Sequence, residues 1–266
     1  MKTNVPFLFI LVITTLFLLN CSDNSTNNTT PPVVKKYYIS TVKRNNVLME
    51  EYTYNSDNNL IKYQLTDSSG VAYCDFIYNT SGVLTDLAVY FSSLPIGSVV
   101  VDMNSSNNPV KVIKFTLSDT TNSTFEYNAS GYLTKINYFP GSQDLPGLKN
   151  GFRTLTYDTK GNITREVFSE YPVVVNSSQY DYVYDLKNSP HNYSQLKWPY
   201  YLVMNFLSLD GYNLSHFLSK NNIVKITKTI PTPVAVTNYS YLYNSDGYPT
   251  KLTLGSDVYD ITYIVK

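Results

Sequence analysis

The chain has 266 residues, of which 20 are basic and 20 acidic, so its formal net charge is zero. A neutral chain lacks the positive field that draws nucleic acid, so we expect no nucleic-acid partner. Tyrosine is the unusual component, with 26 copies against 12 Phe and one Trp. Because tyrosine favours strands and packs its ring while its hydroxyl reaches water, this composition predicts an all-β domain with partly hydrated sheet faces.

The N-terminus has the parts of a secretory signal, with Lys2 before an apolar run at Pro6–Leu19. A membrane-spanning helix needs about 20 apolar residues, so this run is too short to predict one. It ends in Leu18-Leu19-Asn20-Cys21, which resembles the lipobox of bacterial lipoproteins. The resemblance implies that residues 1–20 are removed and that lipid is attached at Cys21. An ordinary signal peptide with a chance cysteine is the alternative.

The next segment, Ser22–Val34, is rich in Asn, Ser, Thr and Pro and has no apolar periodicity. Such a composition predicts a disordered tether. We therefore expect the lipidated Cys21 and its tether over residues 21–36 and a single β-domain over residues 37–266. The expected location is the outer membrane, by a lipid anchor, with the periplasmic face and the cell surface both open.

A short motif recurs seven times and decides the predicted fold. The copies contain Tyr54-Asn55, Tyr78-Asn79, Met103-Asn104, Tyr127-Asn128, Tyr157-Asp158, Tyr184-Asp185 and Tyr243-Asn244. The Asn or Asp side chain can bind backbone N–H groups further along a turn. Three residues later each copy has Gly or Asn, which tolerate positive φ: Asn58, Gly82, Asn107, Gly131, Gly161, Asn221 and Gly247. This pattern is typical of a type I turn closed by a left-handed bulge residue.

In that hairpin register Tyr54, Tyr78, Tyr127 and Tyr157 face Leu60, Leu84, Leu133 and Ile163. The next pairs are predicted to set Tyr52, Val101, Phe125, Leu155, Tyr182 and Tyr241 opposite Lys62, Lys111, Lys135, Arg165, Lys225 and Lys251. These six bases are either an anion-binding stripe or, as we expect, stems that lie along apolar neighbours with their charges in water.

Each copy supplies two antiparallel strands, which gives about fourteen strands in an up-and-down meander. A sheet of that length should curl into a barrel or a strongly bent sheet. The Tyr-Asn/Asp-x-x-Gly-x-Leu-Thr-Lys pattern looks like the YD repeats of Rhs-type proteins. Together with the lipobox it is similar to small YD-repeat envelope lipoproteins of Gram-negative bacteria, an uncharacterised family to which a porin-like fold is ascribed. The resemblance covers residues 37–266 and implies no catalytic residue.

Residues 186–218 interrupt the sixth copy and contain the only Trp and both His of the chain. The run from Lys197 to Gly211 predicts a short helix, with Pro199 at its first position and Gly211 past its end. The helix is apolar nearly all round, so we expect it to be a plug or lid buried in the concavity of the sheet. The alternative is a ligand- or partner-binding site formed by Trp198, Tyr200, Tyr201 and Tyr212.

No motif indicates a metal, a cofactor or a catalytic group. His191 and His216 are too far apart for a zinc motif of two neighbouring His, and no Cys or acid cluster joins them. Cys74 lies in a strand-like stretch and is expected to be a small buried hydrophobe.

The leading interpretation is a non-catalytic envelope lipoprotein that binds a ligand or partner, a glycan or an envelope protein, through its aromatic-rich sheet. The alternative is an integral outer-membrane β-barrel pore, because the predicted strands approach the length of about 9–11 residues that a spanning strand requires. The polar turns, and a lysine row predicted to share a face with the tyrosines, stand against it. A hydrolase of envelope polysaccharide or peptide is a further alternative. The oligomeric state is not predicted.

Overall fold

The structure is a computed structural model, which describes residues 35–145, 147, 150–170, 177–191, 194–207 and 214–266. Its strands form one 17-stranded antiparallel sheet. They are β1 (Tyr37–Arg44), β2 (Val47–Tyr54), β3 (Leu60–Asp67), β4 (Gly70–Tyr78), β5 (Leu84–Phe91), β6 (Leu94–Met103), β7 (Pro109–Thr116), β8 (Thr120–Tyr127), β9 (Leu133–Pro140), β10 (Gly151–Tyr157), β11 (Ile163–Glu170), β12 (Ser178–Asn188), β13 (Asn221–Ile230), β14 (Ala235–Asn238), β15 (Ser240–Tyr243), β16 (Pro249–Leu254) and β17 (Asp257–Val265). The seven copies of the repeat supply β2–β13, β15 and β16, and the strands outside the repeat are β1, β14 and β17.

The turns opened by Asn or Asp, here called Asx turns, have the predicted chemistry. In the first, Asn55 Oδ1 accepts hydrogen bonds from the backbone N–H groups of Asp57 and Asn59, and Asn58 has a φ of 65°. The same two hydrogen bonds recur at Asn79, Asn104, Asn128, Asp158 and Asn244. Positive φ recurs at Gly82, Asn107, Gly131, Gly161 and Gly247. One side-chain oxygen and one left-handed residue therefore define each tip.

The interrupted sixth copy keeps half of this arrangement. Asp185 Oδ1 accepts the N–H of Lys187 at 2.9 Å and the N–H of Asn222, beyond the insertion, at 3.1 Å. The prediction of positive φ at Asn221 is wrong, because Asn221 begins β13 and returns from the insertion already extended.

The bulge after each Asx turn decides which face the next residues take. Tyr54 pairs with Leu60 as predicted, but Thr53 then pairs with Lys62, and Tyr52 pairs with Tyr63. The predicted pairing of Tyr52 with Lys62 is therefore wrong, because the bulge uses one extra residue and reverses the alternation. The same correction applies to the other five bases, whose partners are Asp102 for Lys111, Glu126 for Lys135, Thr156 for Arg165, Val183 for Lys225 and Leu242 for Lys251. The basic row faces outward and the aromatic and aliphatic row faces inward.

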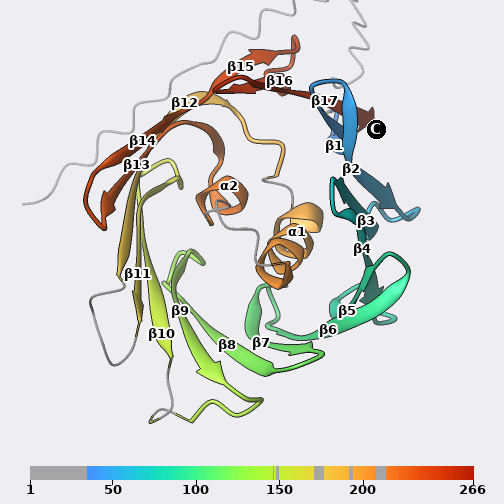
Figure 1. Ribbon diagram of the computed structural model, residues 1–266, viewed down its shortest axis with the longest axis vertical. Coiled ribbons are helices and arrows are strands. Elements are labelled where there is room, and N and C mark those ends of the chain that lie inside the picture. The colour runs from blue at the N-terminus through green and yellow to red at the C-terminus, as the bar shows by residue number, and fades with distance from the viewer. Residues whose placement is uncertain (1–34, 146, 148–149, 171–176, 192–193, 208–213) are drawn as a thin grey trace, which may run out of the picture. The chain divides into compact units, whose positions relative to one another are not determined.

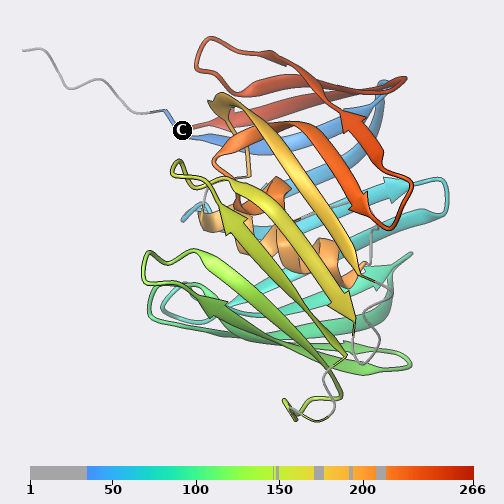
Figure 2. The ribbon, with the colours of Figure 1, turned by 90° about the vertical axis from the view of Figure 1, so that its left-hand side faces the viewer.

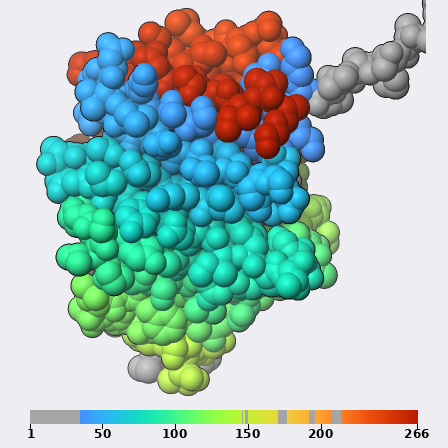
Figure 3. Space-filling model, turned by 90° about the vertical axis from the view of Figure 1, so that its right-hand side faces the viewer, coloured from blue at the N-terminus to red at the C-terminus, as the bar shows by residue number. Residues whose placement is uncertain are grey.

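The two ends of the domain meet and bring the sheet round into a nearly closed barrel, which confirms the predicted all-β barrel. β1 pairs with β17 from Tyr37 opposite Val265 to Arg44 opposite Tyr259. Figure 3 shows these first and last strands, blue and red, on one face of the molecule. β14 and β15 are successive pieces of one strand, interrupted at Tyr239, and the remaining strands follow side by side around the wall (Figures 1 and 2).

The insertion after β12 enters the barrel. Its helices α1 (Ser194–Phe206) and α2 (Ser215–Leu218) lie inside the ring of strands (Figure 1). Side chains of α1 share one hydrophobic core with the inward residues of the strands, so the helix is a plug. Pro199 lies within α1 rather than at its first position. Packing of the apolar helix on all sides offsets the backbone hydrogen bond that proline removes. In the described parts of the chain, no helix is long and apolar enough to cross a membrane.

Candidate functional site

The predicted aromatic residues of α1 are buried in the lumen. Trp198 and Tyr201 both pack edge-on against Phe125 of β8. Trp198 also borders a hollow of about 120 Å³ among the Asx turns, which is small for a ligand pocket. Tyr212 and the lipidation residue Cys21 lie outside the described residues. Trp198 and Tyr201 therefore hold the plug against one wall of the barrel.

The plug covers only part of the inner wall. Inward residues of the central strands, such as Leu87 and Ile136, are fully buried, whereas Leu252 and Leu254 of β16 and Ile261 of β17 keep partial exposure. This uncovered stretch borders a cavity of about 300 Å³ between the plug and strands β1 and β13–β17. Small-molecule pockets have volumes of about 300–1,000 Å³ and largely apolar linings. The cavity is therefore the candidate site, and of the predicted site residues that the structure describes, Tyr200 lines it.

A carboxyl group, Glu50 of β2, lies in the wall of this apolar cavity. Its side chain accepts hydrogen bonds from the hydroxyl groups of Tyr52 and Tyr200, the latter at 3.0 Å. Burial raises the pKa of Glu50, and the hydrogen bonds from Tyr52, Tyr200 and Tyr63 oppose that rise. Glu50 also adds to the increase in the pKa of Tyr259 on β17, which burial causes in the first place. Glu50 is therefore a buried acid that neutral hydroxyl groups hold at the cavity wall.

Both histidines of the chain line the same cavity. His191 stacks on Tyr200, with ring centroids 4.8 Å apart and planes 10° apart. Burial, with a smaller contribution from His216, lowers the pKa of His191 to about 3. His191 is therefore a neutral imidazole at physiological pH. The residues that the structure describes bring together no group of three His, Cys, Asp or Glu side chains that could hold a metal ion.

A second buried carboxylate, Glu166 of β11, lies elsewhere in the lumen and has a cation. Arg153 of β10 donates to Glu166 Oε1 at 2.5 Å, and the hydroxyl of Tyr182 donates to Oε2 at 3.1 Å. Nothing in the sequence singled out Glu50 or Glu166 among the acids of the chain. Glu166 follows its turn and becomes an inward position once the bulge is counted, whereas Glu50 precedes its turn and shares the inward face of Tyr52 by alternation.

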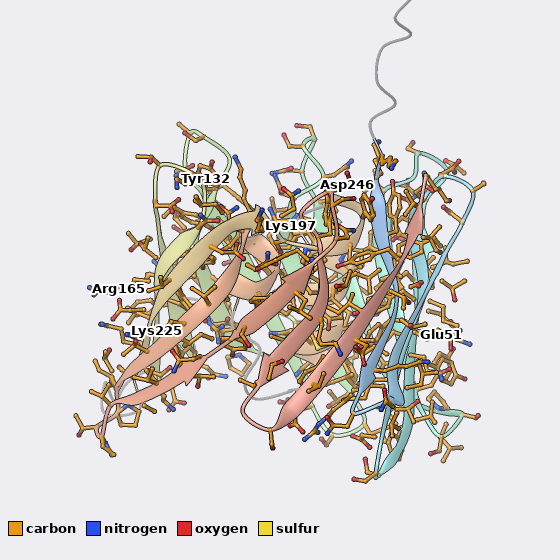
Figure 4. The ribbon with its side chains drawn as sticks, turned by 90° about the horizontal axis from the view of Figure 1, so that it is seen from above. Glu51, Tyr132, Arg165, Lys197, Lys225 and Asp246 are labelled. Atoms are coloured by element: carbon orange, nitrogen blue, oxygen red, sulfur yellow. The ribbon has the colours of Figure 1, made fainter. Side chains whose placement is uncertain are left out.

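The six bases of the repeat lie on the outer face. Lys111, Lys135, Arg165 and Lys251 form ion pairs with Asp144, Glu126, Asp181 and Asp260. Lys62 lies over the ring of Tyr73. Figure 4 shows Arg165, Lys225 and Glu51 pointing away from the barrel. Five of the six bases thus have acidic or aromatic neighbours at the outer face, which favours solvated stems over an anion-binding stripe.

Cys74 is buried and is a free thiol. Burial, with a smaller contribution from Asp75, raises the pKa of its thiol to about 12. It therefore packs as an inert hydrophobe, as predicted.

No protein-family model matches the chain, and no curated protein matches its sequence. Solved structures do match. A porin-like protein from Bacteroides uniformis is 14% identical, with a TM-score of 0.55 over 81% of this chain and 89% of that one. A porin-like protein from Bacteroides vulgatus is 12% identical, with a TM-score of 0.41 over 85% of this chain and 99% of that one. At this identity the first match shows that the fold is porin-like.

Proposed function

We propose that this protein is a lipid-anchored barrel of the bacterial envelope that binds a small, largely apolar ligand beside its plug. One observation carries the proposal: the plug leaves the inner wall of β16 and β17 uncovered and borders it with a cavity of about 300 Å³. Apolar side chains that a plug fails to cover lose the packing that stabilises the rest of the core. A ligand that fills the space would restore those contacts.

The chemistry of the wall favours an apolar ligand over the glycan expected from composition. The cavity is bordered mainly by aliphatic and aromatic side chains, including Ile39, Phe217, Ile223 and Leu252. A glycan carries many hydroxyl groups, and each one buried without a hydrogen bond costs free energy. For a hydrolase, Glu166 is already paired with Arg153, so the described interior offers no second carboxyl group to act with Glu50.

A pore in the outer membrane is the second candidate, and the porin-like fold favours it. Two features make binding the better account. α1 and α2 occupy the lumen through which a solute would pass. The outward face carries Lys62, Asp75, Asp102, Lys111, Glu126, Lys135, Arg165, Asp181, Lys225, Lys251 and Asp260. Lys or Arg on the lipid face of a barrel costs about 2–4 kcal/mol at the bilayer midplane.

The attachment to the membrane is proposed from the lipobox at Cys21 and the tether that follows it. The YD-type repeat, which resembles that of small envelope lipoproteins, supports the same proposed location. Labelled palmitate should enter the wild-type protein and not a Cys21→Ser variant. Alkaline carbonate should leave the anchored protein with the membrane and release the Cys21→Ser variant, whereas an integral pore would stay in the membrane in both forms.

The binding claim is tested with the neutral apolar probe N-phenyl-1-naphthylamine, whose emission rises in apolar surroundings. We expect saturable binding by the wild-type protein. A Leu252→Trp variant, which fills the cavity, should bind at least tenfold more weakly. Thr253→Trp places the same ring one residue along β16, on the outer face, and should bind like the wild type. Equal binding by all three proteins would place the probe elsewhere and refute the proposal.

A further inference from the structure

The two buried carboxyl groups of the lumen differ in their partners. Glu166 is 1% exposed and forms an ion pair with Arg153. Glu50 is 5% exposed, and among the described residues no lysine, arginine or histidine forms an ion pair with it. Its hydrogen-bond donors are the neutral hydroxyl groups of Tyr52 and Tyr200. Buried carboxylates in proteins are ordinarily paired with a cation, and burial without one raises the pKa of Glu50, so a cation in the cavity would favour its charged form.

The unpaired carboxyl group is on the wall of the cavity rather than enclosed within the packed core. Tyr200 of the plug, Tyr239, Tyr241 of β15 and Tyr259 of β17 line that cavity with it. The faces of tyrosine rings attract organic cations, and sites for quaternary ammonium groups are built from such rings. The remaining wall is aliphatic and suits an apolar body.

Resting on the proposed function, we propose that the ligand is an amphipathic organic cation, an amine or quaternary ammonium with an apolar body. Its charged head pairs with Glu50 among the tyrosines, and its body covers Leu252 and Ile261 on the uncovered wall. The ammonium group of the ligand then pairs with Glu50 as the Arg153 guanidinium pairs with Glu166.

The other charged classes of ligand fit this site less well. A carboxylate head would lie beside the Glu50 carboxylate in a site of low polarity, where like charges repel strongly. His191, which lines the same cavity, is neutral at physiological pH, because burial lowers its pKa to about 3. His191 therefore offers no positive charge to such an anion, and competition by octanoate measures whether His216, the other histidine of the cavity, attracts one. A neutral head would leave Glu50 without a counter-ion.

The test compares three probes of one chain length, octylammonium, octanol and octanoate, as competitors for bound N-phenyl-1-naphthylamine at pH 7.5. On the wild-type protein, octylammonium should compete about ten- to hundredfold better than octanol, the advantage expected of a charge-assisted contact. Octanoate should be the weakest competitor. In a Glu50→Gln variant the advantage of octylammonium over octanol should disappear while octanol still competes.

The neighbouring acid is the matched control, because Glu51 is exposed and outward, and Glu51→Gln should compete like the wild type. Equal competition by octylammonium and octanol on the wild type, or an advantage that survives Glu50→Gln, would overturn the choice of a cation. In either result the probe is still bound and displaced, so the proposed function stands. Failure of the wild type to bind the probe at all refutes the proposed function, and the inference with it.

Discussion

The ion pair between Arg153 and Glu166 should be the costliest of the ion pairs to break from one side. Glu166 is 1% exposed and the Arg153 side chain 25% exposed, at 2.5 Å from each other. Removal of one partner from a buried pair costs about 3–5 kcal/mol, because the remaining charge stays in a poorly hydrated site. The partial exposure of Arg153 lets some water reach Glu166, so we expect about 3 kcal/mol for Arg153→Met.

The matched control is Arg165→Met on the outer face. It breaks an ion pair of similar length, 2.6 Å, between the more exposed side chains of Arg165 and Asp181. Such exposed pairs contribute about 0–1 kcal/mol. Both variants are measured by equilibrium unfolding in urea. The double variant Arg153→Met/Glu166→Gln should recover at least half of the loss, since no charge is then left buried. Equal losses for Arg153→Met and Arg165→Met, or no recovery in the double variant, would refute the argument.

Three further outcomes follow from the packing and charge of the lumen. Gly97→Ala should lower the free energy of unfolding by about 2 kcal/mol. The new Cβ would lie 2.2 Å from the Phe115 carbonyl oxygen and 2.5 Å from Phe206 Cζ. A loss below about 0.5 kcal/mol in urea unfolding would contradict this contact. Trp198→Ala should cost about 3–5 kcal/mol by leaving a cavity between plug and wall, and unchanged stability would contradict the plug. For His191, the pKa lowered from 6.5 to about 3 means that the unfolded chain binds the proton first; its stabilising contribution is present above pH 6.5 and lost as the pH falls toward 3. His191→Phe should therefore flatten the loss of stability over that range, and parallel pH profiles would contradict the assignment.

The hairpins were predictable because their chemistry is local. An Asn or Asp and a left-handed residue three positions later fix a turn regardless of the rest of the chain, so the tips and the pairing of Tyr54 with Leu60 follow from sequence. The interruption was predictable as a plug because a helix apolar on all sides must be buried. The position of Pro199 was not, because packing inside the barrel overrides the local preference of proline.

The site was harder to predict because it depends on the face that each residue takes. The bulge adds one residue, and without that correction the lysine row and the tyrosine row were set on one face. The correction moves the residues after each turn, whereas the inward position two residues before Tyr52 and its equivalents keeps its face and is occupied by Glu50, Cys74, Val99, Ser123, Arg153, Tyr180 and Tyr239. Two of these seven, Glu50 and Arg153, are charged, and Arg153 pairs with Glu166, which the bulge brings to the inward face of β11. The size of the space that the plug leaves open depends on tertiary packing, which no single sequence displays.

The most direct test of the proposed function uses Trp198, the only tryptophan of the chain and a buried residue of the plug. Its emission overlaps the absorption of N-phenyl-1-naphthylamine, so energy transfer reports a probe bound close to the plug, and the Leu252→Trp and Thr253→Trp variants separate the inner from the outer face. We predict that addition of the probe quenches Trp198 emission with a saturable, single-site dependence, and that an excess of octylammonium restores it. Probe binding that leaves Trp198 emission unchanged would place the ligand outside the lumen and contradict the proposed function.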